Sequence, residues 1–122
     1  MRPDIIIYSQ QIQKVIMIEL TCPAEENILS AQIRKSAKYM GLQNLISSSG
    51  NWTSQLITIE VGARGYPANS VRHCLKKLGI RKNVAKKAIK ALSTTAAKCS
   101  YGIFLMRNNQ CWQKQDLVYI DV

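Results

Sequence analysis

The sequence has few of the features that mark membrane, secreted or zinc-binding proteins. Its longest apolar runs, 15–18 and 101–106, are far shorter than the ~20 residues that cross a bilayer, and its N-terminus has no basic-then-apolar signal pattern. Its four cysteines form no CxxC pair and are accompanied by one histidine, which argues against a zinc site and a disulfide framework. We therefore expect an intracellular protein with reduced cysteines and no membrane partner.

Acidic residues are scarce, and one long region has none. The 122 residues contain 17 Lys and Arg against 7 Asp and Glu, which gives a formal net charge of +10. Residues 1–60 hold five basic and five acidic side chains, whereas residues 61–115 hold twelve basic side chains and no acid. Clustered positive charge favours a polyanionic partner, most simply nucleic acid, although a solvated basic surface has the same composition.

What remains is the composition of one folded domain, since 122 residues with 47% apolar side chains form a single hydrophobic core. β-Branched and aliphatic residues at 4–8 and 15–21 predict a β-hairpin that turns near 10–13. Alternation over 55–61 predicts a third strand, and the polar stretch 47–51 predicts a loop.

Helices are expected after the hairpin and after the third strand. Residues 24–40, extending as far as 46, have apolar side chains at helical spacing, namely Ile28, Leu29, Ile33, Ala37 and Met40. Two basic helices should follow, one over 69–78 that ends at Gly79 and one that Asn83 caps and that reaches residue 97 or beyond.

This order of elements predicts a mixed α/β (α+β) fold with a small mixed sheet. We expect residues 1–61 to form a hairpin-helix-strand core and residues 62–115 a basic helical part of the same single domain. A short strand is expected at 117–122. The first strand begins almost at residue 1, so we expect the chain to be truncated at its N-terminus.

Two of the few carboxylates lie in the predicted hairpin. Asp4 begins the first strand and Glu19 lies near the end of the second, in runs that are otherwise apolar. Paired cross-strand residues have Cβ atoms ~5 Å apart, where two negative charges repel unless a cation lies between them. Mg²⁺ takes one or two carboxylates together with waters and phosphate oxygens. The pair therefore predicts a Mg²⁺ (or Mn²⁺) site, although Asp4 could also simply end a strand in solvent and Glu19 could have a protein partner in place of a metal.

A lysine beside such a site would orient the attacking water or stabilise charge in a phosphoryl transition state. Thr21, two positions after the second carboxylate, cannot do this, whereas the following helix offers Lys35 and Lys38. There Gln32, Lys35 and Tyr39 form a polar stripe on one helical face, and Lys38 is the alternative lysine. The same lysines also suit the solvated face of an amphipathic helix.

These residues resemble a known family. Arg-Pro-Asp at 2–4, then Glu-Leu-Thr at 19–21, then a helix with Arg-Lys-Ser-Ala-Lys-Tyr, then Glu-Val-Gly-Ala-Arg-Gly at 60–65 resemble the restriction-like endonuclease domain of non-LTR retrotransposon reverse transcriptase proteins. That domain belongs to the PD-(D/E)xK nuclease superfamily, and in this branch the lysine has moved from the strand to the helix. The resemblance covers about residues 2–112.

The resemblance implies Mg²⁺-dependent nicking of target DNA. It assigns Asp4 and Glu19 as metal ligands, Lys35 or Lys38 as the catalytic lysine and Tyr39 as a supporting residue. It also implies a restriction-endonuclease-like core that lacks its upstream helix, a nuclear location, and contact with RNA as part of a larger retroelement complex. The alternative is a non-catalytic nucleic-acid-binding module or a decayed nuclease fragment. The sequence indicates no oligomeric state.

Basic side chains in the second half are candidates for DNA phosphate contacts, which release counterions and make binding salt-dependent. They are Arg64, Arg72, Lys76, Lys77, Arg81, Lys82, Lys86, Lys87 and Lys90. Arg64 lies in the turn at 62–65, whose two glycines suit either a phosphate-binding loop or a tight connection.

Overall fold

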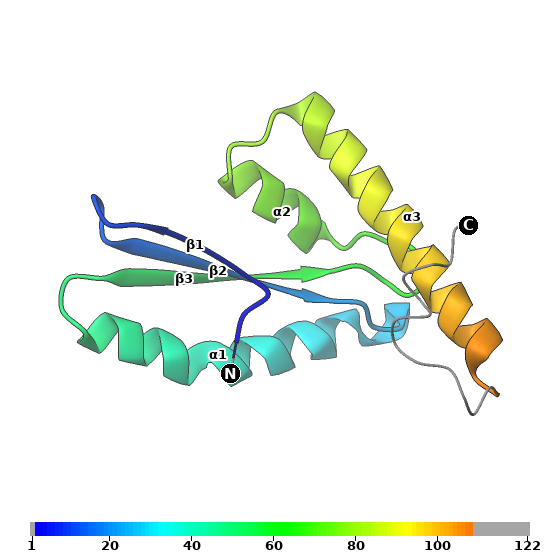
Figure 1. Cartoon of the computed structure of the whole chain (residues 1–122), viewed down its shortest axis with the longest axis horizontal. Helices are drawn as coiled ribbons and strands as arrows, with labels where there is room; N and C mark the ends of the chain where they lie inside the picture. Colours follow the sequence, from blue (N-terminus) through cyan, green and yellow to red (C-terminus); the bar gives the residue numbers. More distant parts are fainter. Residues whose placement is uncertain (1, 109–122) are drawn as a thin grey trace.

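Three strands and three α-helices make up residues 2–108, the part of the chain that the computed structural model describes (Figure 1). The strands are β1 (Ile5–Ser9), β2 (Lys14–Thr21) and β3 (Thr53–Glu60). The helices are α1 (Ile28–Ser48), α2 (Asn69–Lys77) and α3 (Lys82–Met106), and a 3-10 turn at Glu25–Asn27 precedes α1. The predicted mixed α/β fold with a small mixed sheet is confirmed.

The sheet has the order β1-β2-β3, with β1 antiparallel to β2 and β2 parallel to β3. The hairpin turn ends at Gln13, whose φ of 52° lies in the left-handed region. A parallel pair needs a crossover, and α1 provides it between β2 and β3. All three strands begin and end within two residues of the predicted limits.

Helices cover both faces of this sheet (Figure 1). Helix α1 packs on one face, while α2 packs against β3 on the other and α3 packs against α2. Because alternate strand residues point to opposite faces, Ile18 and Ile57 meet Cys74 of α2 in one buried cluster. Met17 and Glu19 point the other way, toward α1. The carboxylate in β2 therefore faces a helix and not solvent.

The face of α1 that meets the sheet differs from the predicted one. Of the five residues expected to form its apolar face, Ile28 is half-buried and the other four are exposed, among them Leu29 by 68%, Ile33 by 61% and Met40 by 58%. The buried stripe instead contains Ala31 and Tyr39, which are 1% and 0% exposed. Both stripes have helical spacing, so periodicity alone did not distinguish them. Of the polar stripe, Lys35 and Tyr39 face the sheet because they provide partners for a carboxylate there, while Gln32 stays exposed.

The helix ends show smaller differences from the prediction. Gly79 follows α2 with φ 73°, the left-handed conformation expected after a helix. Arg81 is the N-cap residue of α3, so the predicted cap Asn83 lies within its first turn. Helix α1 continues to Ser48, into the expected loop. The strand expected at 117–122 lies outside the described residues.

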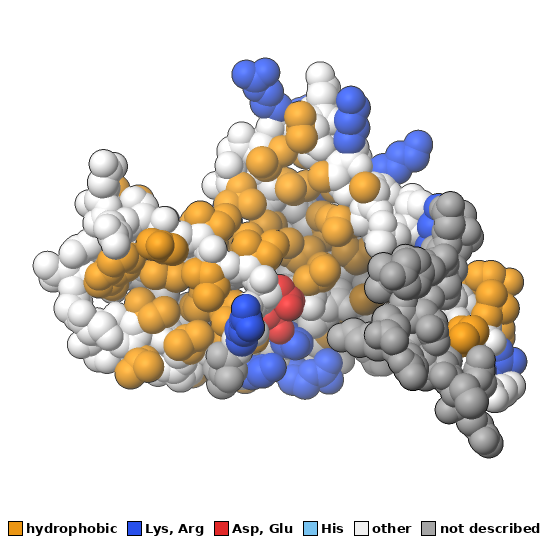
Figure 2. Space-filling view, in the orientation of Figure 1, with side chains coloured by type: hydrophobic (Ala, Val, Ile, Leu, Met, Phe, Trp, Pro, Cys, Tyr) orange, Lys and Arg blue, Asp and Glu red, His pale blue; other side chains and the backbone are white. Residues whose placement is uncertain are grey.

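Strand β1 forms one edge of the sheet and has an apolar, exposed surface. Ile5 and Ile6 are each 52% exposed, and Tyr8 is 66% exposed. Figure 2 shows hydrophobic side chains spread over the strands, with Lys and Arg side chains projecting near α2 and α3. Within residues 2–108, no helix combines the length and the apolar character that a membrane span requires.

Candidate functional site

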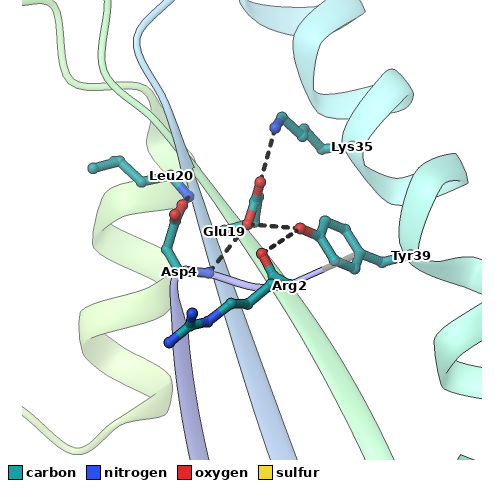
Figure 3. Close-up of polar contacts among 6 residues, drawn as sticks. All are labelled: Arg2, Asp4, Glu19, Leu20, Lys35 and Tyr39. Atoms are coloured by element: carbon teal, nitrogen blue, oxygen red, sulfur yellow. Dashed lines mark hydrogen bonds and ion pairs between the residues drawn. The ribbon is translucent and has the colours of Figure 1, made fainter. Parts of the chain in front are cut away.

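The hairpin register brings Asp4 and Glu19 together, as the sequence predicts. Ile5 pairs with Ile18 in the antiparallel hairpin, so Asp4, which precedes Ile5, lies opposite Glu19, which follows Ile18. The backbone N–H of Asp4 donates to Glu19 Oε2 at 3.3 Å, and the N–H of Leu20 donates to Asp4 Oδ2 at 2.9 Å (Figure 3). Each carboxylate is thus held by the backbone of the neighbouring strand.

Helix α1 adds a lysine and a tyrosine to this pair (Figure 3). Lys35 Nζ lies 2.8 Å from Glu19 Oε1, in an ion pair whose side chains are 22% and 6% exposed. The Tyr39 hydroxyl lies 3.1 Å from Glu19 Oε2 and 3.0 Å from the carbonyl oxygen of Arg2, and these two acceptors share its single hydrogen. We call Asp4, Glu19, Lys35 and Tyr39 the carboxylate–lysine cluster.

Tyr39 acts in this cluster as a hydrogen-bond donor. Burial raises the pKa of Tyr39, and its hydrogen bond to Glu19 and the negative charges of Glu19 and Asp4 raise it as well. The phenol therefore keeps its proton at neutral pH. A carboxylate as buried as Glu19, which is 4% exposed, needs donors. It has three: the Asp4 N–H, the Lys35 ammonium and the Tyr39 hydroxyl.

The two candidate lysines have different surroundings. Lys35 reaches Glu19, whereas Lys38 has an exposed side chain whose Nζ lies 5.3 Å from the centre of the Tyr39 ring. Lys38 forms no ion pair with any described residue. Of the two, only Lys35 belongs to the cluster.

The carboxylate oxygens of the cluster are also suitable ligands for a divalent metal. Asp4 is exposed, and among residues 2–108 hydrogen-bond donors reach only its Oδ2. No three His, Cys, Asp or Glu side chains of that range lie close enough to hold a metal by themselves. Mg²⁺ commonly takes one or two carboxylates and completes its coordination with waters and phosphate oxygens. Asp4 and Glu19 fit that kind of site.

A third buried carboxylate, Glu60, was not among the predicted site residues. It ends β3, is 1% exposed, and neither of its carboxylate oxygens has a hydrogen-bond partner among the described residues. Thr21, its register partner on β2, has a buried hydroxyl without a partner there too. Burial raises the pKa of Glu60, and the neighbouring Thr58 and Ser70 hydroxyls, which lower it, offset this shift in part.

Glu60→Met is expected to raise the free energy of unfolding by about 1–3 kcal/mol near pH 8, where the native state holds a carboxylate without a partner. A raised native pKa means that the folded state binds this proton more tightly than the unfolded state does. The contribution of Glu60 to stability is then complete below its ordinary pKa of 4.5 and is lost as the pH rises through the native value. The gain in Glu60→Met should therefore shrink as the pH falls toward 4.5.

Urea unfolding of the wild type and of Glu60→Met near pH 8 and near pH 5 measures this difference. Glu26→Met is the control, because Glu26 is exposed and its replacement should change stability little at either pH. A gain for Glu60→Met that is the same at both pH values would contradict the expectation.

The turn at 62–65 uses its backbone within the protein. Its four N–H groups donate, at 2.7–2.8 Å, to the carbonyl oxygens of Tyr66, Pro23 and Gly62 and to the Glu25 carboxylate. Of the two uses expected for this turn, the backbone therefore serves a tight connection and offers no N–H to a phosphate. The Arg64 side chain remains 87% exposed.

All nine side chains predicted to contact phosphates are exposed. Five of them line a groove of about 780 Å³ between α2 and α3, together with apolar side chains; they are Arg72, Lys76, Lys82, Lys86 and Lys90. Figure 2 also shows a small acidic patch near the middle of the face in view, with Lys and Arg side chains beside it.

Known protein families, curated proteins and solved structures include no match to this chain. Its activity must therefore be inferred from its own residues. Asp4, Glu19, Lys35 and Tyr39 come together, Lys38 does not join them, and Glu60 is a further buried acid.

Proposed function

We propose that this chain is a Mg²⁺-dependent DNA endonuclease domain of the PD-(D/E)xK type, similar to that of non-LTR retrotransposon proteins, and that it nicks target DNA in the nucleus. The observation that carries this proposal is the carboxylate–lysine cluster. Asp4 precedes β1, Glu19 lies in β2 and Lys35 in α1, and both the Asp4 backbone N–H and the Lys35 ammonium donate to the Glu19 carboxylate. They are the residues to which the resemblance assigns catalysis.

Each member of the cluster has a role in this proposal. Asp4 and Glu19 would hold the metal, which when bound polarises the scissile phosphate and lowers the pKa of the attacking water. Lys35 stabilises the negative charge that grows on the phosphate, because its ammonium group stands beside Glu19. Tyr39 is a positioning residue, since it donates to Glu19 from a fully buried position.

The exposed basic residues of α2 and α3 hold the DNA by its phosphates. Residues 61–108 contain no Asp or Glu, so no negative side chain within this segment opposes a polyanion. The same surface would contact RNA in a larger retroelement complex. Phosphate contacts carry no sequence information, so the basic helices supply affinity and orientation and leave recognition of the target to other residues.

One observation favours a second candidate, a non-catalytic nucleic-acid-binding module. Glu19 already has three donors, so its burial is explained by hydrogen bonds and an ion pair even without a metal. In that case the cluster stabilises the fold, and the basic helices carry the whole function.

Incubation with supercoiled plasmid and Mg²⁺ distinguishes the two candidates. The wild type should produce nicked circles, and Asp4→Ala should lower the nicking rate by at least about 100-fold, because a metal supplies several kcal/mol of transition-state stabilisation. Asp4 is exposed, so its removal leaves the core intact. Gln11→Ala, in the turn at the far end of the hairpin, is the control that should nick normally. Plasmid retardation without nicking, equal in wild type and Asp4→Ala, would exclude the nuclease and favour the binding module.

A further inference from the structure

A pocket of about 480 Å³ lies where the start of α1, the end of β3 and the start of α2 meet. Among the residues that line it are Gln32, Glu60, Tyr66, Asn69, Ser70 and His73. This volume is within the range of sites for small organic groups, ~300–1,000 Å³. The lining combines amide, hydroxyl, carboxyl and aromatic side chains, so it suits a flat polar ligand.

Glu60 is a buried side chain of this pocket without a hydrogen-bond partner among the described residues. Both of its oxygens are buried and accept no hydrogen bond from the described residues. Glu25, which also lines the pocket, differs in this respect, because it accepts the Arg64 N–H at 2.8 Å and lies 4.0 Å from the Arg64 guanidinium. A buried acceptor without a donor costs free energy, and native proteins seldom keep one without a use. Glu60 therefore points to a ligand that brings a donor.

The pocket adjoins the carboxylate–lysine cluster along two elements. On α1, Gln32 precedes Lys35 by three residues, so the two lie on neighbouring turns of one helix face. On the sheet, Glu60 pairs in register with Thr21, two residues after Glu19, and these three side chains share one face. A nucleic acid strand at the cluster can therefore place a neighbouring base at the pocket.

The chemistry of the lining narrows the ligand. Among the described residues, the lining contains three glutamates and no Lys or Arg, so it favours a ligand that donates hydrogen bonds. A nucleobase fits: carboxylates accept from exocyclic amino groups of bases, and aromatic rings such as Tyr66, which is 58% exposed, stack on them.

We propose that this pocket binds one unpaired nucleobase that carries an exocyclic amino group, next to the phosphodiester bond at the carboxylate–lysine cluster; this rests on the proposed function. The amino group donates to Glu60 and the ring stacks on Tyr66. Because both Glu60 oxygens are buried, lining side chains must move for the amino group to reach them. Adenine, cytosine and guanine meet the requirement, and thymine does not.

Fluorescence anisotropy with labelled oligo-dT of about nine nucleotides, a length within the range of single-strand sites, tests this in EDTA, where no cleavage occurs. Replacing the central thymine with cytosine or adenine should tighten binding by about 5- to 100-fold. Central purine, which is adenine without its amino group, should bind no better than thymine. Glu60→Met should abolish the gain, and Tyr66→Ala should weaken binding of the cytosine and adenine oligonucleotides by about 5- to 100-fold.

Tyr8→Ala is the control, because Tyr8 is another exposed tyrosine, on β1, and its replacement should change none of these affinities. Equal affinity for all the oligonucleotides, a gain that persists in Glu60→Met, or no binding of any oligonucleotide would overturn the pocket. Failure of the nuclease is distinguishable, because the binding assay needs no catalysis. Plasmid nicking without a base preference contradicts the pocket alone, and a base preference without nicking contradicts the nuclease alone.

Discussion

Lys35→Met is expected to abolish plasmid nicking and to lower the free energy of unfolding by about 3–5 kcal/mol. Methionine keeps most of the side-chain volume but removes the ammonium group. Glu19 would then remain buried at 4% exposure with two donors, the Tyr39 hydroxyl and the Asp4 N–H, and without a counter-ion. Breaking a buried ion pair on one side is costly because the remaining charge is left uncompensated.

Urea unfolding of a double-mutant cycle separates this charge effect from lost packing. Glu19→Gln in the Lys35→Met background should recover most of the lost stability, since it removes the charge that Lys35 balanced. Lys38→Met is the matched control on the same helix: its ammonium is exposed and contacts only the Tyr39 ring, at 5.3 Å, so we expect a loss of at most about 1 kcal/mol and normal nicking. Equal effects of the two substitutions would contradict the assignment of Lys35.

The pairing of Asp4 with Glu19 could be predicted because a hairpin register is a local property. The polar turn at 10–13 fixes which residues face each other, and the apolar runs on either side fix the strands. The sequence positions of the two acids therefore determine that they are cross-strand neighbours. The strand limits and the helix end at Gly79 were predictable for the same reason.

The buried face of α1 depends on packing against the sheet, which sequence periodicity does not describe. Leu29 and Ile33 form a better apolar stripe than Ala31, Lys35 and Tyr39 do, yet the helix face with Ala31, Lys35 and Tyr39 packs on the sheet. The energetic reason is the buried carboxylate of β2, which costs far more without donors than a few exposed aliphatic side chains do. The choice between Lys35 and Lys38 needed this packing as well.

The burial of Glu60 was not predicted, because alternation identifies a strand but does not show which of its two faces a helix covers. Alternation places Glu60 on the same face as Thr58, which pairs in register with Glu19. An acid at that position had to point toward α1 and away from solvent. The sequence signal for Glu60 lies in the polar positions of β2 and β3. Aligning them requires the parallel register, which only the structure supplies.

Gly65→Ala is expected to lower the free energy of unfolding by about 2–4 kcal/mol, the sum of a conformational and a steric cost. Gly65 has φ +96°, where a side chain is strained, and a Cβ there would lie 2.8 Å from the backbone carbonyl oxygen of Ser93 in α3. Because that oxygen belongs to a helix, it cannot move aside as a side chain can. The turn after β3 thus touches α3 at a point where only glycine fits.

Gly50→Ala isolates the steric part of this loss. Gly50 also has a positive φ, +112°, but a Cβ there meets nothing within 4 Å, so its replacement should cost only the conformational part, about 1–2 kcal/mol. The difference between the two variants in urea unfolding measures how tightly the turn holds α3. Amide exchange in α3 should accelerate in Gly65→Ala and stay unchanged in Gly50→Ala, because only the first disturbs that helix. Equal losses of stability, with α3 exchange unaffected in both, would mean that the basic helix α3 is held through α2 alone.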